Sequence, residues 1–282
     1  MESIWTIVKL IDWGTGYLNN HNIESARLNI ELMLSKILNY DRVKLYSNFD
    51  QPLSVKELAM LKVMIKRRIA SEPLQYILGE TYFYGLKFYC RPDVLIPRPE
   101  TELIIEHFSK ITKSKDFTLL DIGTGTGCIA ITLAKMYPNA SITAIDISEQ
   151  AIATAALNAE LHNVQVELIH ADVFEYEFPH MFDYIISNPP YIPLSESKEL
   201  QAEILLHEPS IAYTDGNDGL TYYRRFNGII ERFMNPTGKF LFEIGAGQSK
   251  DLAEILSDKV IDVVFDLSGH DRLIIGANKV LI

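Results

Sequence analysis

The feature that most restricts the fold is a regular alternation, from about residue 117 on, of short apolar runs with runs at helical spacing. Short apolar runs are typical of buried strands, and apolar residues three or four apart are typical of helices. The strand candidates lie in FTLLDIG, SITAIDIS, VQVELIHAD, FDYIISNPP, KFLFEIG, VIDVVFDL and RLIIGAN. This alternation predicts a mostly parallel sheet with helices on both faces. Only SGHD separates the last two runs, so we expect seven strands with an antiparallel last strand.

The first part of the chain has a different pattern. Apolar residues there follow helical spacing, as in Ile23, Ala26, Ile30, Met33, Leu34 and Ile37. Ser54 and Glu57 have the spacing of a capping box before a further helix. From residue 81, TYFYGLKFYC alternates around Gly85 as a hairpin does. We predict three parts: a small helical domain over 1–80, a β-hairpin linker over 81–100 and an α/β domain over 101–282.

The charge of the chain is negative and uneven. Its 282 residues include 26 lysines and arginines against 37 aspartates and glutamates, a net charge of −11. Residues 1–85 hold 10 basic and 9 acidic side chains, so the acidic surplus lies in the α/β part. Such a surface disfavours broad contact with a phosphate backbone and tolerates a small cation. We expect no direct nucleic-acid partner.

Several other classes are disfavoured by the pattern of cysteines, histidines and apolar runs. Cys90 and Cys128 cannot form a disulfide framework, which indicates a reducing compartment. No apolar run approaches the ~18 residues of a membrane span, and the N-terminal stretch shows no signal-peptide pattern. The seven histidines form no metal-binding motif. We expect a cytoplasmic protein without a metal or a membrane association.

A glycine-rich stretch follows Asp121, between the first strand and the next helix. Its residues are Ile122, Gly123, Thr124, Gly125, Thr126 and Gly127. Glycines permit a tight turn and close approach of a ligand, and the helix start offers free N–H groups. A dinucleotide fingerprint would need glycine where Cys128 stands; the GxGxG form resembles the first motif of S-adenosylmethionine-dependent methyltransferases. A turn without a ligand is the alternative.

Two further aspartates follow the next two strands. Asp146 could accept hydrogen bonds from both hydroxyls of a ribose, and Asp172 could accept one from an adenine amine. Ligands bind open α/β sheets at this end of the strands. The alternative is that each aspartate caps a helix, as Asp146 or Ser148 could. Three consecutive strand ends with such residues favour a ligand.

The fourth strand runs into Asn188-Pro189-Pro190-Tyr191. A planar nitrogen is a poor nucleophile because its lone pair is delocalised, so its two N–H groups must be held while the lone pair faces an electrophilic methyl group. The Asn188 side-chain oxygen could accept one proton and the Pro189 carbonyl the other, on a loop that the prolines stiffen. Tyr191 could stack on the planar group and exclude water. An ordinary turn is the alternative.

Six motifs, taken together and in this order, resemble the peptide chain release factor glutamine methyltransferases, the PrmC/HemK family. They are VLIPRPETE, DIGTGTGCIAI, SNPPYI, HEPSIAYTDGNDGLTYYR, FEIGAGQ and DLSGHDR. The resemblance implies a seven-stranded Rossmann-like class I methyltransferase sheet and a helical N-terminal domain. It also implies transfer of a methyl group from S-adenosyl-L-methionine to the side-chain nitrogen N5 of the glutamine in the GGQ motif of class 1 release factors.

The resemblance also assigns site residues. Cofactor binding is implied for Gly123, Thr124, Gly125, Thr126, Gly127, Asp146, Asp172, Val173 and Asn188. Substrate binding is implied for Asn188, Pro189, Pro190 and Tyr191, of which Asn188, Pro189 and Tyr191 are the catalytic candidates, and Ile96–Pro99 would line the pocket. Some members have tryptophan where this chain has Val173, so Phe174 could supply the surface against the adenine.

Two other functions stay open. A methyltransferase for N6 of adenine, or for another exocyclic amine of DNA or RNA, could use the same loop at Asn188, but it should show a basic groove. A regulatory module could bind S-adenosylmethionine without catalysis. We favour the release factor as the partner, with the nearly neutral helical domain as its reader. Because the substrate is then a large folded protein, we expect a monomer.

Overall fold

The computed structural model describes residues 4–278, which contain one seven-stranded sheet and one hairpin. The strands of the sheet are β3 (Thr118–Ile122), β4 (Ser141–Asp146), β5 (Glu167–His170), β6 (Phe182–Ser187), β7 (Met234–Glu243), β8 (Val260–Phe265) and β9 (Asp271–Ala277). Their order is β5-β4-β3-β6-β7-β9-β8, and β9 is antiparallel to both of its neighbours. The predicted sheet with a reversed last strand is confirmed. From β3 the chain first adds β4 and β5 on one side and then β6 and β7 on the other. A crevice is therefore expected between β3 and β6, at their carboxyl ends.

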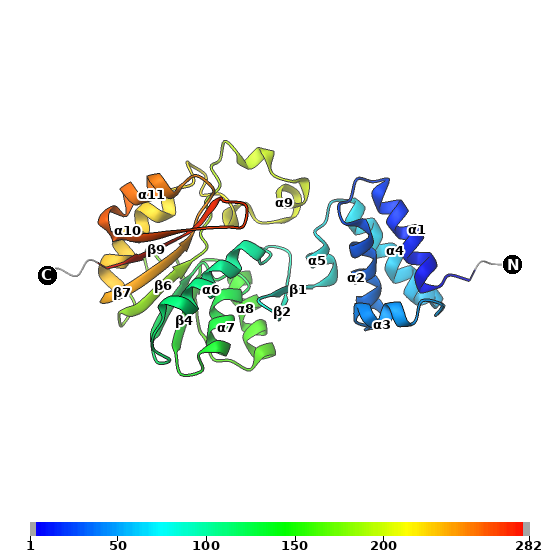
Figure 1. Cartoon of the computed structure of the whole chain (residues 1–282), viewed down its shortest axis with the longest axis horizontal. Coiled ribbons are helices and arrows are strands. Elements are labelled where there is room, and N and C mark those ends of the chain that lie inside the picture. Colours follow the sequence, from blue (N-terminus) through cyan, green and yellow to red (C-terminus); the bar gives the residue numbers. More distant parts are fainter. Residues whose placement is uncertain (1–3, 279–282) are drawn as a thin grey trace. The chain divides into compact units, whose positions relative to one another are not determined.

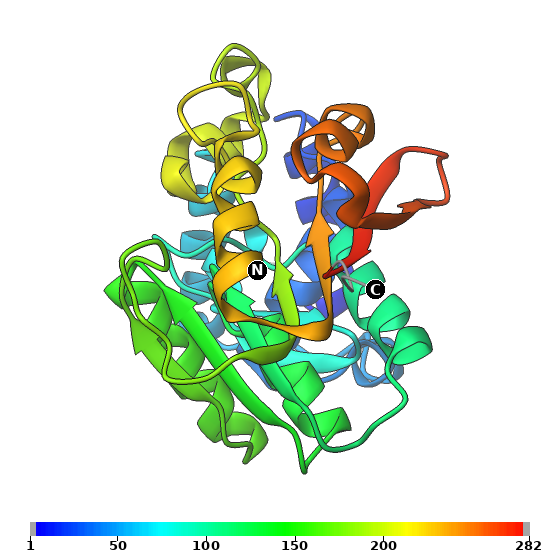
Figure 2. The same cartoon turned by 90° about the vertical axis from the view of Figure 1, so that its left-hand side faces the viewer.

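Helices cover both faces of this sheet (Figure 1, Figure 2). One face carries α6 (Glu102–Ile111), α7 (Cys128–Met136) and α8 (Glu149–His162), and the other carries α10 (Thr221–Phe233) and α11 (Ser249–Ile255). Side chains of a strand alternate between faces, so Ile186 lies in the first core and Ile185 in the second. Both cores are rich in large apolar side chains, which fix the register of the sheet.

The helical unit comprises the residues up to Gly79 together with Ala202–His207. Its helices are α1 (Ile7–Asn19), α2 (Ala26–Leu38), α3 (Arg42–Ser47), α4 (Val55–Ile69), α5 (Leu74–Leu78) and α9 (Ala202–His207). The predicted capping box of Ser54 and Glu57 is present at the start of α4. That helix ends at Ile69. Short 3-10 turns elsewhere are η1 (Pro99–Thr101), η2 (Ser197–Glu199), η3 (Ser210–Ala212) and η4 (Ser257–Lys259).

Strands β1 (Glu80–Phe83) and β2 (Leu86–Tyr89) form an antiparallel hairpin. Tyr84 and Gly85 turn the chain with φ of 47° and 74°, the left-handed pair that a two-residue hairpin loop needs. The side chain of Asn158, on α8, accepts from the Tyr89 N–H (2.7 Å) and donates to the Thr126 carbonyl (2.9 Å). One buried amide thus fixes the end of the hairpin to the glycine-rich loop. No helix among residues 4–278 is long and apolar enough to cross a bilayer.

Candidate active site

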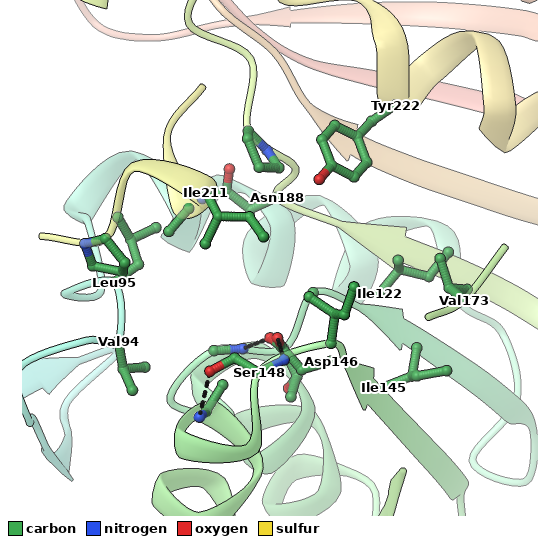
Figure 3. Close-up of a pocket in the computed structure, with 18 of the residues that line it drawn as sticks. Val94, Leu95, Ile122, Ile145, Asp146, Ser148, Val173, Asn188, Ile211 and Tyr222 are labelled. Atoms are coloured by element: carbon green, nitrogen blue, oxygen red, sulfur yellow. Dashed lines mark hydrogen bonds between the residues drawn. The ribbon is translucent and has the colours of Figure 1, made fainter. Parts of the chain in front are cut away.

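A cavity opens at the carboxyl ends of β3, β4 and β6, where the sheet order predicts a crevice. Figure 3 shows Asp146 and Ser148 on one side of it, with Asn188 and Tyr222 on the opposite side. The wall also includes Val94, Leu95, Pro97, Arg98, Thr101, Ile122, Gly123, Thr124, Gly125, Asp172, Val173, Phe174, Pro190, Ile211 and Arg225. Residues from seven separate stretches of sequence therefore meet around one space.

The glycine-rich loop gives this cavity an open floor. A Cβ at Gly123 would meet no atom within 4 Å, so a ligand can approach the backbone there. Gly127 has a different role, because its φ is +80° and a Cβ would lie 2.7 Å from Cδ1 of Ile131. Gly127 immediately precedes α7, and its backbone lies close to the side chain of Ile131 on that helix. Gly123, Thr124 and Gly125 line the cavity, whereas Thr126 and Gly127 are not part of its lining.

Asp146 holds the loop in place through its two carboxylate oxygens. Oδ2 accepts from the N–H of Gly125 (2.9 Å), and Oδ1 accepts from the N–H of Ser148 (2.9 Å). The cap of α8 is Ser148, whose hydroxyl accepts from the Ala151 N–H. Each oxygen of Asp146 has a second lone pair for a ligand. Burial raises the pKa of this carboxyl, although the two backbone donors oppose that effect.

The residues that follow β5 supply an apolar part of the cavity wall. Val173 is buried against the cavity wall, and Oδ1 of Asp172 accepts from the N–H of Phe174 (2.9 Å). The guanidinium of Arg225 lies 3.6 Å from the centroid of the Phe174 ring. Tyr222 stands next to the same ring, at 5.9 Å between centroids. Phe174 therefore contacts both a cation and an aromatic ring of α10.

The loop after β6 brings Asn188 and Pro190 to the cavity. Nδ2 of Asn188 donates to Oγ1 of Thr101 (3.0 Å). Pro189 is buried between them, and Tyr191 lies outside the wall, where its hydroxyl donates to Oε1 of Glu243 (3.3 Å). The structure thus brings Asn188 together with Asp146 and Val173 around one cavity, but it does not place Pro189 or Tyr191 in the lining.

Two buried carboxyl groups lie outside the cavity lining but interact with residues of the same loops, Asp121 with Asp146 and Glu243 with Tyr191. Burial raises the pKa of Asp121, below the glycine-rich loop, to about 7, and that of Glu243 also to about 7. Within the described chain, Oδ1 of Asp121 is buried without a hydrogen-bond partner. Carboxylates in a medium of low dielectric attract a nearby cation strongly. A small sulfonium ligand fits this environment, and residues 4–278 contain no group of three potential metal ligands.

Sequence reasoning missed three features of this site. Thr101, which accepts from Asn188, and Glu243, which accepts from Tyr191, are each 2% exposed, although both lie in motifs that carry the family resemblance. Glu243 is the last residue of β7, as Asp146 is of β4, so its position at a strand end is the signal that points to it. The third feature is the ion pair from Nη2 of Arg98 to Oε1 of the buried Glu208 (2.5 Å), which no sequence spacing reveals.

Two family models match separate parts of the chain. The family described as "PrmC N-terminal domain" matches residues 9–79, and the family described as "Methyltransferase small domain" matches residues 99–217. The first match lies on the helical part of the chain, and the second contains most of the residues that line the cavity.

Curated relatives cover nearly the whole chain. A release factor glutamine methyltransferase from Geobacter sulfurreducens is 43% identical over 276 residues, which is 97% of each chain. One from Chlorobaculum tepidum is 35% identical and covers 93% of each chain. One from Bacillus subtilis is 34% identical and covers 95% of this chain and 96% of its own.

Solved structures resemble the sheet and its helices. A methyltransferase from Pyrococcus furiosus has a TM-score of 0.53 at 20% identity, covering 79% of this chain and 98% of that one. A 16S rRNA N2 G1207 methyltransferase from T. Thermophilus, solved in complex with AdoMet and guanosine, has a TM-score of 0.51 at 17% identity, covering 71% of this chain and 50% of that one. With the strand order, these similarities confirm the Rossmann-like class I methyltransferase fold.

Proposed function

The chain belongs to the family of release factor glutamine methyltransferases, and from this membership we propose that it methylates the glutamine of the GGQ motif in class 1 peptide chain release factors. The enzyme uses S-adenosyl-L-methionine, which supplies an electrophilic methyl group bonded to a sulfonium. The acceptor is the side-chain nitrogen N5 of the glutamine. The open glycine-rich loop and the buried carboxyl groups support binding of this cofactor.

Asp146 and Asp172 are proposed to hold the cofactor through its ribose and its adenine amine. Asp146 has acceptor capacity left after its two backbone hydrogen bonds. Val173, with Phe174 beside it, offers an apolar surface to the adenine. Gly123, Thr124 and Gly125 would face the methionine part, and Thr126 and Gly127 would support the loop from behind.

The structural observation that carries the proposal is the hydrogen bond between Asn188 and Thr101 on the cavity wall. It engages the NH₂ group of Asn188, so the side-chain oxygen can accept an N–H of the substrate amide. The Pro189 carbonyl, between two lining residues, is proposed to accept the other N–H. Both contacts orient the nitrogen lone pair toward the methyl group, which is a positioning effect rather than base catalysis. Pro190 completes the wall, and Tyr191 supports the loop through Glu243.

The direct test is mass spectrometry of a class 1 release factor after incubation with this protein and S-adenosylmethionine. We expect a mass gain of one CH₂ group on the GGQ glutamine. A release factor with alanine in place of that glutamine is the control and should gain nothing. Incorporation of labelled methyl groups into DNA or RNA, but not into the release factor, would overturn the proposal in favour of base methylation.

A regulatory module without catalysis is tested by Asn188→Ala. We expect turnover to fall by orders of magnitude, because the substrate nitrogen is no longer oriented. The dissociation constant of S-adenosylmethionine should change much less. Equal turnover in the variant and the wild type would remove Asn188 from the mechanism.

The division of labour within the chain is also a proposal. We assign recognition of the protein substrate to residues 1–80, linkage to residues 81–100 and methyl transfer to residues 101–282. The protein is proposed to act as a cytoplasmic monomer without direct contact with nucleic acid, since its methyltransferase part is acidic. An intact release factor should then have a higher kcat/KM than a short GGQ peptide, and equal values would contradict this division.

A further inference from the structure

We propose that Gln248 is a positioning residue, which holds the main chain of the loop after β6 and so keeps Asn188 and the Pro189 carbonyl in place. This inference rests on the proposed function, because it concerns how that loop orients the substrate nitrogen. It assigns a role to the glutamine of the FEIGAGQ motif and to Asp271 of the DLSGHDR motif.

The loop after β6 has few backbone donors of its own. Pro189 and Pro190 have no N–H group, so neither position can be fixed by a backbone hydrogen bond in which it donates. The loop must be held there through carbonyl groups and side chains. The carbonyl of Tyr191 accepts from Nε2 of Gln248 (2.9 Å). Gln248 therefore holds the chain directly after the two prolines.

The side-chain amide of Gln248 joins three segments of the chain. Its Oε1 accepts from the N–H of Gly245 (2.8 Å), in the turn after β7. Its Nε2 donates to the carbonyl of Tyr191 and, at a longer distance, to that of Gly219 (3.5 Å), in the loop before α10. The opposite orientation of the amide would place Oε1 against two carbonyl oxygens, which cannot donate. The contacts therefore fix the amide in one orientation.

Close packing around this amide supports the same conclusion independently of the hydrogen bonds. A Cβ at Gly219 would lie 2.2 Å from the carbonyl oxygen of Tyr191 and 3.0 Å from Nε2 of Gln248. A Cβ at Gly245 would lie 3.0 Å from Oε1 of Gln248 and 3.2 Å from Cδ2 of Tyr191. Glycine at both positions lets the three segments approach this closely. Tyr191 therefore has little room to move away from Gln248.

The turn that carries Gln248 is itself held by Asp271, the first residue of β9. Oδ1 of Asp271 accepts from the N–H of Gly247, and Oδ2 accepts from the N–H of Ser249 (2.9 Å). Both sequence neighbours of Gln248 are thus bound to one carboxylate, which belongs to a buried residue. A side chain can fix a loop only if its own main chain is fixed, and Asp271 meets this condition.

The contact with Tyr191 leaves the proposed acceptors available. Within the described chain no donor reaches the carbonyl of Pro189, which is proposed to accept one N–H of the substrate. Release of Tyr191 would let Pro189 and Asn188 move relative to the methyl group. A displacement of about 1 Å can lower a rate by about 100-fold. Because Asp146 and the glycine-rich loop lie on other strand ends, we expect the affinity for S-adenosylmethionine to change little.

The experiment compares Gln248→Met and Gln248→Glu with the wild type on a GGQ-containing release factor. Methionine removes both hydrogen-bonding groups at similar length, whereas glutamate keeps the acceptor for Gly245 and turns an oxygen toward the Tyr191 carbonyl. We expect both variants to lower kcat by about 10- to 100-fold. The KM for the release factor, and the dissociation constant and stoichiometry of S-adenosylmethionine binding, should stay nearly unchanged.

Gln165→Met is the matched control, because it makes the same chemical change at an exposed glutamine outside the cavity lining. Its kcat should equal that of the wild type. A control with the same loss as Gln248→Met would contradict a specific role of Gln248.

Combination with Asn188→Ala separates a positioning role from a general loss of structure. Residues that act through one loop have effects that do not multiply. Gln248→Met should therefore lower the kcat of Asn188→Ala much less than that of the wild type. A general loss of structure would lower both by the same factor and would reduce the stoichiometry of S-adenosylmethionine binding.

Three results would overturn the inference and leave the proposed function intact. They are a wild-type kcat in both Gln248 variants, effects that multiply with Asn188→Ala, and a loss of cofactor stoichiometry in both Gln248 variants. If the wild-type protein itself transfers no methyl group to the glutamine, the proposed function fails and this inference fails with it.

Discussion

Replacing Asp146 by alanine tests the cofactor site most directly, because two consequences can be separated. The carboxylate accepts from the backbone N–H groups of Gly125 and Ser148, both at 2.9 Å, and its remaining lone pairs are proposed to accept from the ribose hydroxyls. Removal of the side chain therefore takes two hydrogen bonds from the loop in the ligand-free protein. It also leaves the hydroxyls of a bound ribose without their proposed acceptor. The first effect appears in thermal unfolding and the second in ligand affinity.

The magnitude follows from the cost of leaving polar groups without a partner. Such a loss costs about 1–3 kcal/mol, which corresponds to an increase in dissociation constant of about 5- to 150-fold. Asp146→Asn should restore little of it. Since donors approach both carboxylate oxygens, the amide NH₂ group would face either the Gly125 N–H or the Ser148 N–H.

Isothermal titration calorimetry with two ligands distinguishes a ribose contact from a general charge effect. S-adenosylmethionine carries the sulfonium charge, whereas S-adenosylhomocysteine has the same ribose without that charge. A ribose contact predicts nearly equal losses of affinity for both ligands in Asp146→Ala. Unchanged dissociation constants for both would remove Asp146 from the site, and a loss confined to S-adenosylmethionine would refute the hydrogen-bonding role.

Two further predictions concern stability. Burial raises the pKa of Asp121 and Glu243 to about 7, so the folded state keeps protons that the unfolded chain releases above about pH 4. The free energy of unfolding, measured with urea, should fall from about pH 5 to about pH 8, and less steeply in Asp121→Asn; a rise would contradict the burial argument. Gly127→Ala should cost at least about 1–2 kcal/mol, because of its φ of +80° and the contact with Ile131. Gly16→Ala, in α1 with no atom within 4 Å of the new Cβ, should instead add about 0.5–1 kcal/mol, and equal effects of both substitutions would refute this reasoning.

The sheet could be predicted because its information is local in sequence. Apolar runs of strand length, separated by helical periods, predict a parallel sheet, and the short link before β9 requires its reversal. The capping box at Ser54 was predictable for the same reason. By contrast, α9 is too short to show a helical period, and its place beside the N-terminal helices depends on contacts across more than a hundred residues, such as the ion pair of Arg68 with Glu203 (2.8 Å).

The same distinction applies to the site. Asp146, Val173 and Asn188 follow strands of one sheet, so topology alone predicts that they meet at one edge. Thr101 lies before the first strand of that sheet, and only its hydrogen bond with Asn188 reveals a function. Hydrogen-bond partners of this kind are set by side-chain geometry, which residue spacing does not encode.

The inclusion of Ala202–His207 in the helical unit affects how such a chain can be recombined during evolution or in the laboratory. Glu203 forms an ion pair with Arg68, and His207 contacts the carbonyl of Ala70 (3.3 Å). A chimera with a single recombination point at Gly79 would combine the N-terminal helices of another protein with the α9 of this one. That α9 would then lack the helices beside which it evolved. Chimeras of this protein should therefore exchange both segments together, and a nick in one of them need not release the other.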